Sequence, residues 1–130
     1  MKKIEAIIRP ERATTVCYAL EELGCFGVTV YTASGHGIQG GLRQQWRGHE
    51  CLVDQVPKVV VMAVVPEDDL REAVETIQAI AKTGRMGDGK VFITAVERAL
   101  RVRTGETGQS ALRPSKVAPS DDTATPGSQS

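Results

Sequence analysis

Apolar positions along the chain repeat one pattern twice: a short β-rich run, a proline, and then a run with helical spacing. The β-rich runs are Lys3–Ile8 and Val59–Val65, and the prolines are Pro10 and Pro66. Proline fits the first position of a helix because its missing N–H has no partner there, and acidic residues follow both prolines, where they complement the helix dipole. After each proline, apolar side chains recur every three or four residues, which predicts two amphipathic helices.

A second strand is expected after each helix. Gly24 and Gly84 follow the last apolar positions of the two helical runs and predict where the helices stop. The β-rich segments Val28–Ser34 and Lys90–Thr94 come next. The order β-α-β, β-α-β predicts an α+β fold of the ferredoxin-like type, with one antiparallel sheet backed by two helices. A last short run, Ala99–Arg103, fits a fifth strand at the sheet edge.

One connection is much longer than this plan needs. About twenty residues, Gly35–Pro57, separate two strands that a hairpin loop of about two to five residues could join. The segment contains the only tryptophan of the chain, Trp46, and both of its histidines. Loops of this length are either functional or disordered, and the large and polar side chains favour a functional loop at about residues 36–57.

The composition is that of one globular domain in a reducing compartment. The chain has 130 residues, of which 41% are hydrophobic, and 16 basic residues balance 16 acidic ones. This neutrality argues against a general nucleic-acid binder, and the longest apolar run is too short to cross a bilayer. Three cysteines at irregular spacing and the lack of a secretory signal favour the cytoplasm. Residues 1–112 form the expected domain, and residues 113–130, rich in Pro, Ser and Thr, are expected to be a disordered tail.

The segment Thr83–Lys90, with the sequence TGRMGDGK, indicates an anion-binding turn. Its glycines allow consecutive backbone N–H groups to point at one anion. The spacing approaches that of a Walker A loop, but Val91 stands where that loop needs Ser or Thr for Mg²⁺, and a strand follows instead of a helix. The residues therefore favour a phosphate site of another kind.

Positive charge gathers around this turn. Between Lys82 and Arg103, six basic residues outnumber two acidic ones in an otherwise neutral domain. Arg101 and Arg103 alternate along the last expected strand, so both are expected on the same side of it. Two guanidinium groups and Lys90 would clamp a polyphosphate. The alternative is an edge strand that charges protect from aggregation, which the two arginines alone would favour.

Three segments carry a resemblance to a known family. The opening MKKIEAIIRP, the segment Thr83–Ile93 and the segment Arg101–Glu106 closely resemble the PII nitrogen-regulatory signal proteins, and the likeness spans nearly all of Met1–Leu112. The resemblance implies a cytoplasmic, non-enzymatic homotrimer that binds ATP or ADP between subunits, together with Mg²⁺ and 2-oxoglutarate. Its long loop would regulate a target protein, which could be a transporter, a nitrogen-metabolism enzyme or a regulator. Nucleic acid is not an expected partner, and a membrane would be reached only through a transporter.

The resemblance also implies which residues form the site. The nucleotide would contact Thr29, Gly37, Ile38, Gln39, Val64, Gly87, Asp88, Gly89, Lys90, Arg101, Val102 and Arg103. The 2-oxoglutarate would contact Gln39, Gly41, Lys58 and Gly87. In this scheme the Gln39 side chain completes the shell of the Mg²⁺ ion, a hard cation that prefers oxygen ligands, and Lys58 pairs with the far carboxylate. Arg101 and Arg103 would come from the adjoining subunit.

Several residues depart from the family pattern. Ile38 stands where many relatives carry an arginine near the phosphates, and Gly40 stands where many carry a lysine. Each lost charge-assisted contact would weaken nucleotide binding. Met62 replaces a common glutamate and makes the pocket wall more apolar. Cys51 replaces a tyrosine that is uridylylated in some relatives, and His49 replaces a serine that is phosphorylated in others, so neither modification is expected.

Two alternatives remain open. His49 and Cys51 are potential soft-metal ligands, so the protein could regulate a metal or other transporter, with a metal or a small anion replacing 2-oxoglutarate as the second signal. The other alternative is an enzyme such as a nucleotide hydrolase. The sequence around the glycine turn contains no carboxylate pair and no Ser/His/Asp set, which disfavours that interpretation.

Overall fold

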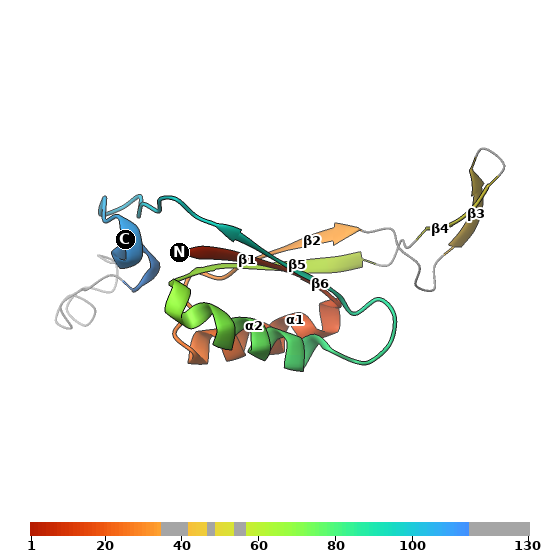
Figure 1. The fold of residues 1–130 in the computed structure, drawn as a ribbon, viewed down its shortest axis with the longest axis horizontal. Helices are drawn as coiled ribbons and strands as arrows, with labels where there is room; N and C mark the ends of the chain where they lie inside the picture. Colours follow the sequence, from red (N-terminus) through yellow and green to blue (C-terminus); the bar gives the residue numbers. More distant parts are fainter. Residues whose placement is uncertain (35–41, 47–48, 54–56, 115–130) are drawn as a thin grey trace, which may run out of the picture.

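The computed structural model describes residues 1–34, 42–46, 49–53 and 57–114. A four-stranded antiparallel sheet and two helices that cover one of its faces form the body of the fold (Figure 1). Along the chain its elements are β1 (Lys2–Ile8), α1 (Pro10–Glu22), β2 (Thr29–Ser34), β5 (Pro57–Val65), α2 (Glu67–Ala81) and β6 (Gly89–Ala95). A second sheet pairs β3 (Leu42–Trp46) with β4 (His49–Val53), and a short 3-10 helix, η1, covers Gly108–Leu112.

The strand order of the main sheet is β2-β5-β1-β6. Each β-α-β half places a strand of the other half between its own two strands, so the halves interlock. This is the predicted double β-α-β fold. In the register of the sheet, Ile8 at the end of β1 lies opposite Val59 near the start of β5 and opposite Gly89 at the start of β6. Residues that flank these three positions therefore meet at one end of the sheet.

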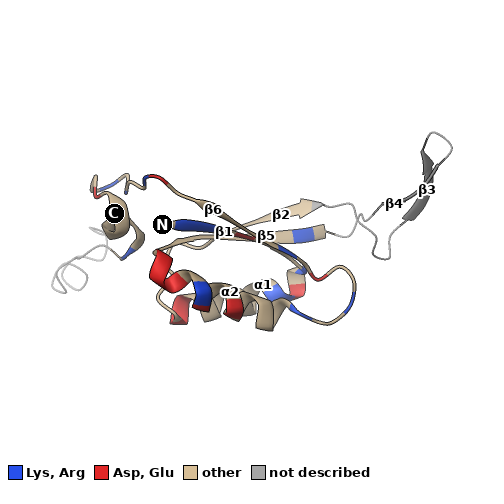
Figure 2. Cartoon of the chain, in the orientation of Figure 1, with Lys and Arg blue, Asp and Glu red and all other residues tan. Residues whose placement is uncertain are grey.

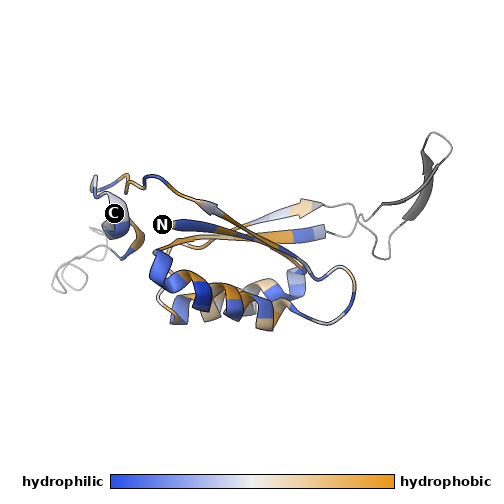
Figure 3. Cartoon of the chain, viewed as in Figure 1, coloured by the Kyte–Doolittle hydropathy of each residue, from blue (hydrophilic) through white to orange (hydrophobic). Residues whose placement is uncertain are grey.

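The core lies between the sheet and the helices. Ile4, Ala6 and Ile8 are buried and alternate with more exposed neighbours along β1, as expected for a strand with one covered face. The helices add buried residues to the same cluster: Ala13, Val16, Leu20, Ala73 and Ile77. Figure 3 shows apolar residues along the sheet strands and alternating with hydrophilic ones along α2. The helices leave the opposite face of the sheet uncovered, and Tyr31 and Phe92 on that face are about half exposed.

The helix starts and one helix end agree with the sequence pattern. Pro10 occupies the first turn of α1, and Pro66 directly precedes α2, whose first turn carries three acidic residues (Figure 2). At the end of α1, Gly24 adopts a left-handed conformation with φ of 89°, which lets the N–H of the next residue, Cys25, reach back to the Leu20 carbonyl at 2.9 Å. The prediction that Gly84 stops the second helix is wrong, because α2 already ends at Ala81 and the next residue is extended.

The long connection contains a hairpin that the sequence analysis did not predict. β3 and β4 pair in antiparallel register with Trp46 opposite His49, so only two residues join them. The second of these residues is Gly48, a residue type that favours tight hairpin turns, and Trp46 and Val53 in the flanking segments belong to types with β propensity. These short-range signals were present in the segment that we treated as a loop.

The fifth strand expected at Ala99–Arg103 is not formed. A single bridge joins Leu100 to Thr107, and the chain between them makes a tight turn. The turn closes through hydrogen bonds from the Gly105 N–H to the Arg101 carbonyl and from the Arg101 N–H to the Glu106 carbonyl, both at 2.8 Å. Gly105 has a φ of 75°, a conformation that reverses the chain and that glycine adopts without strain. Arg101 and Arg103 therefore do not alternate along a strand.

The sequence predicts a disordered tail after residue 112 and no membrane-spanning segment. Most of the expected disordered tail, residues 115–130, lies outside the described residues. In the described segments, neither helix is long and apolar enough to span a membrane.

Candidate functional site

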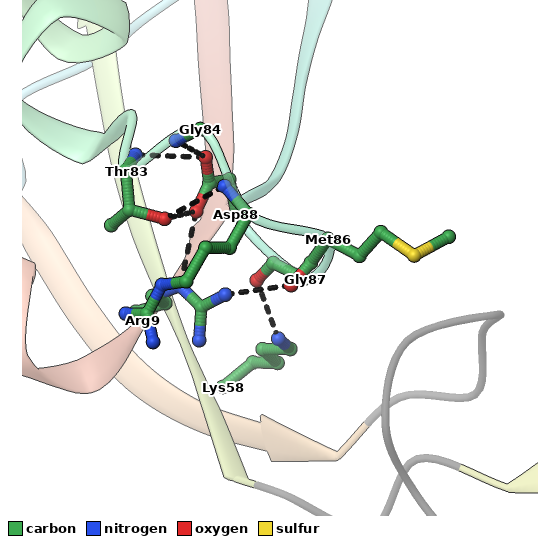
Figure 4. Close-up of polar contacts among 8 residues, drawn as sticks. Arg9, Lys58, Thr83, Gly84, Met86, Gly87 and Asp88 are labelled. Carbon is green, nitrogen blue, oxygen red and sulfur yellow. Dashed lines mark hydrogen bonds and ion pairs between the residues drawn. The ribbon is translucent and has the colours of Figure 1, made fainter.

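The glycine-rich turn between α2 and β6 is built around the carboxylate of Asp88. One carboxylate oxygen accepts hydrogen bonds from the Thr83 N–H at 2.8 Å and from the Gly84 N–H at 2.9 Å, and the other accepts from the Thr83 hydroxyl (Figure 4). The Thr83 hydroxyl, the Thr83 amide, the Arg9 guanidinium and the Gly84 amide hold the pKa of Asp88 well below its usual range. The carboxylate thus stays charged and closes the turn on itself.

Two basic side chains, one directly after β1 and one in β5, bind the same turn. Arg9 follows β1 and donates from Nε to the Asp88 carboxylate at 3.1 Å and from Nη2 to the Met86 carbonyl at 2.7 Å (Figure 4). Lys58, which is only 5% exposed, donates from Nζ to the Gly87 carbonyl at 2.8 Å. The sheet register explains why Arg9 and Lys58 both reach the turn. They adjoin Ile8 and Val59, which lie at the same end of the sheet as the start of β6.

The end of the turn fits against the β1 backbone so closely that no side chain could stand there. A Cβ atom on Gly89 would lie 1.7 Å from the Ile7 carbonyl oxygen, and the φ of Gly89 is 104°. Gly87 has a φ of 95°, again a conformation that favours glycine. Glycines in these conformations let neighbouring backbone N–H groups converge on an anion, which is the chemistry that the sequence indicates.

The uncovered face of the sheet brings together further predicted nucleotide residues. Thr29 of β2 lies opposite Met62 of β5, and Val64 lies two residues further along the same face of β5. Lys90 of β6 lies on this face as well, since its partner Ile7 is opposite Val60. At about 3.3 Å per residue, Thr29 and Val64 lie about 10 and 17 Å along the strands from the level of Gly89. The face can therefore extend a binding site from the turn toward an apolar surface.

The two arginines of the predicted clamp lie at the other end of β6 from the glycine turn. The turn precedes Gly89 and the arginines follow Ala95, so the length of β6, about 20 Å, separates the two groups. The Nε of Arg101 forms an ion pair with Glu106 at 3.2 Å, and its Nη2 donates to the carbonyls of Ser110 at 3.2 Å, of Ala111 at 3.3 Å and of Arg113. Val102 and Arg103 are exposed at the tip of their turn. One chain does not bring the clamp together.

Other predicted site residues fall outside the described part of the chain. These are Gly37, Ile38, Gln39 and Gly41. His49 and Cys51 lie in β4, but their side chains are outside the described structure. Among the described residues, no group of three His, Cys, Asp or Glu side chains gathers in a way that could hold a metal ion.

The sequence analysis missed Arg9 as a component of the site. Its only signal was its position, directly after the first strand and before Pro10. Its contact with the turn depends on the sheet register and on the path of the turn, neither of which the local sequence specifies.

Comparisons with known proteins agree on one family. Residues 1–106 match the family described as nitrogen regulatory protein P-II. The chain is 46% identical to the nitrogen regulatory protein P-II of Bradyrhizobium diazoefficiens and 48% identical to that of Rhodospirillum rubrum, each over 112 residues that cover 86% of this chain and 100% of the relative. It is also 46% identical to the nitrogen regulatory protein P-II 2 of Methanothermobacter thermautotrophicus, over 86% of this chain and 97% of that protein.

Proposed function

The chain belongs to the P-II family of nitrogen regulatory proteins and is a non-enzymatic signalling protein, and from this premise we propose that it is a cytoplasmic sensor of adenine nucleotides. P-II proteins are homotrimers that regulate target proteins, and they typically bind ATP or ADP and 2-oxoglutarate. In this proposal ATP or ADP binds between subunits, and the nucleotide state sets the shape of the loop at residues 36–57, which contacts the target.

The observation that carries the proposal is the pinned glycine turn at one end of the uncovered sheet face. The turn offers backbone N–H groups to the phosphates, and Lys90 adds a positive charge on the same face. Thr29, Met62 and Val64 provide a wall for the base and the ribose. These residues lie about 10–17 Å along the strands from the level of Gly89. Met62 makes this wall more apolar than the glutamate that is common in the family.

A second subunit would supply the arginines. Arg101 and Arg103 lie at the far end of β6 from the turn of their own chain, so they can reach a phosphate only at the turn of a neighbouring copy. The half-exposed Tyr31 and Phe92 on the uncovered face give that neighbour an apolar surface to bury. The proposed trimer therefore completes a site that one chain leaves incomplete.

The proposal includes a second ligand next to Lys58. An Mg²⁺ ion coordinated by the nucleotide and the Gln39 side chain would be chelated by 2-oxoglutarate, whose far carboxylate would pair with the buried Lys58 ammonium. Support comes from the position of Lys58, whose Nζ already lies 2.8 Å from the carbonyl of Gly87 in the proposed phosphate turn. The two ligands would thus meet at one place.

Calorimetry on the purified protein tests the nucleotide site. The parent is expected to bind ATP or ADP in the micromolar range, and Lys90→Ala and Arg103→Ala are each expected to weaken binding about tenfold or more. Arg71→Ala is the matched control, because the Arg71 side chain is 89% exposed on α2 and pairs only with Glu75 in the described structure. Light scattering should give the mass of a trimer. Unchanged affinity in both site variants, or a monomeric parent, would contradict the proposal.

A separate titration tests the second ligand. With Mg²⁺ present, 2-oxoglutarate is expected to tighten ATP binding by the parent but not by Lys58→Met, which keeps the length of the side chain and loses its charge. An ATP affinity that 2-oxoglutarate leaves unchanged would mean that another signal, such as a metal or a small anion, replaces the dicarboxylate.

A further inference from the structure

Two consecutive carbonyl groups of the glycine turn are held by two cations. Arg9 holds the Met86 carbonyl at 2.7 Å, and Lys58 holds the Gly87 carbonyl at 2.8 Å (Figure 4). Arg9 makes its second contact with Asp88, the residue that closes the turn. One cation directly follows β1 and the other lies in β5, so the turn is fixed against the sheet at two successive peptide units.

These contacts decide where the neighbouring N–H groups point. A trans peptide unit is planar, and its C=O and N–H point in opposite directions. All peptide bonds that the structure describes here are trans. With the Met86 and Gly87 carbonyls turned toward Arg9 and Lys58, the N–H groups of Gly87 and Asp88 point away from these cations. Two adjacent N–H donors, those of Gly87 and Asp88, are thus on the side of the turn that faces away from the sheet. Adjacent N–H groups of this kind can bind one anion.

Arg9 also offsets a charge that would work against the site. The Asp88 carboxylate carries a full negative charge directly beside the turn, and any phosphate bound there would be repelled by it. The Arg9 and Asp88 side chains are only 17% and 23% exposed, so water screens this charge less than it would at the surface. The ion pair between the Arg9 Nε and the Asp88 carboxylate, at 3.1 Å, neutralises this charge.

We propose that Arg9 is a positioning residue of the phosphate turn: it orients the Gly87 and Asp88 N–H groups and neutralises Asp88, and it makes no contact with the nucleotide itself. The inference rests on the proposed nucleotide site and assigns a role to a residue outside the set implied by the family resemblance. The guanidinium group is required because one side chain must reach a carboxylate and a carbonyl at the same time, which an ammonium group does less well.

The test compares ATP with AMP, which shares the base and the ribose but lacks the outer phosphates. Arg9→Gln is expected to lower the affinity for ATP about tenfold and to change the affinity for AMP less than about twofold. Arg9→Lys should give an intermediate ATP affinity, because it keeps the charge and one of the two contacts. Arg71→Gln is the control for removing a surface arginine, and it should match the parent for both ligands.

A second readout follows the turn without nucleotide. In amide NMR spectra of the ligand-free protein, the Gly87 and Asp88 signals should shift in Arg9→Gln and stay in place in Arg71→Gln. Equal losses of ATP and AMP binding, unchanged ATP binding, or unmoved Gly87 and Asp88 signals would overturn the role of Arg9. If Arg9→Gln does not fold, Arg9→Lys is judged by the same ATP-to-AMP comparison. A parent that binds no ATP would refute the proposed function, while the amide signals would still decide whether Arg9 orients the turn.

Discussion

The close approach of Gly89 to β1 predicts a large loss of stability from one added methyl group. In Gly89→Ala, the new Cβ would lie 1.7 Å from the Ile7 carbonyl oxygen and 2.8 Å from the Ile7 carbonyl carbon. Neither atom can yield easily, because β1 is paired with β5 on one side and with β6 on the other. The chain must either break the pairing at the start of β6 or distort the centre of the sheet.

The magnitude follows from the contacts that would be lost. Breaking one or two ladder hydrogen bonds costs about 1 kcal/mol each, and a side chain at a φ of 104° adds about 1–2 kcal/mol. The expected loss is therefore about 2–4 kcal/mol of the free energy of unfolding. Gly84→Ala is the matched control, because Gly84 also has a positive φ, of 88°, but no atom within 4 Å of the added Cβ. Its cost should be about 1 kcal/mol, from the backbone conformation alone.

Urea unfolding followed by circular dichroism measures both variants against the parent. The free energy of unfolding should be lower in Gly89→Ala than in Gly84→Ala by about 1 kcal/mol or more, with similar m-values if both variants remain two-state. Equal stabilities for the two variants would refute the reasoning, because they would mean that the contact between the turn and β1 does not constrain residue 89.

Three further predictions concern single residues. Because the pKa of Asp88 is lowered in the fold, its carboxylate stabilises the protein at pH values above the unfolded-state pKa of about 3.9, and this stabilisation is lost as the pH falls below that pKa. In urea unfolding at a series of pH values, Asp88→Asn should therefore lose less stability than the parent on the acid side, and parallel curves would contradict this. The Arg101 guanidinium binds the Ser110 and Ala111 carbonyls of η1, so Arg101→Met should speed amide hydrogen exchange in η1 and leave exchange in β1 unchanged. Equal exchange rates of η1 in the variant and the parent would contradict this. The Cys25 side chain is only 5% exposed, and burial raises the pKa of its thiol. Iodoacetamide should therefore alkylate Cys25 much more slowly in the native chain than in the unfolded chain, as measured by peptide mass spectrometry, and equal rates would contradict this.

The main sheet and its helices could be predicted because their signals are local. A β-rich run, a proline and an acidic first turn occur twice, and each specifies an element through hydrogen-bonding and dipole effects that act within a few residues. Gly24 ends α1 as predicted for the same reason. Gly84 gave the same signal but was misassigned, because its N–H bonds to the carboxylate of Asp88, four residues further on, and not to the helix.

The turn at Arg101–Gly105 shows how alternation can mislead. The sequence RVR reads as an edge strand, but the Thr104-Gly105 pair that follows reverses the chain and leaves only one bridge, between Leu100 and Thr107. The hairpin of β3 and β4 was missed for the opposite reason, since the length of its segment outweighed the two-residue spacing, with Gly48, between Trp46 and His49.

The site itself is where local reasoning stops, because its geometry is produced by register. The sequence of the glycine turn predicts donors for an anion, but it does not say which way they point. That direction is set by Arg9 and Lys58, which are 49 residues apart in the chain and reach the turn only because the ends of β1 and β5 adjoin the start of β6. Arg9 and Lys58 hold two carbonyls of the turn toward the sheet, so the protein itself supplies part of the ordering that a phosphate would otherwise impose. The proposed nucleotide sensor needs a fixed receptor for the phosphates, and in the described structure the sheet fixes the glycine turn in this way.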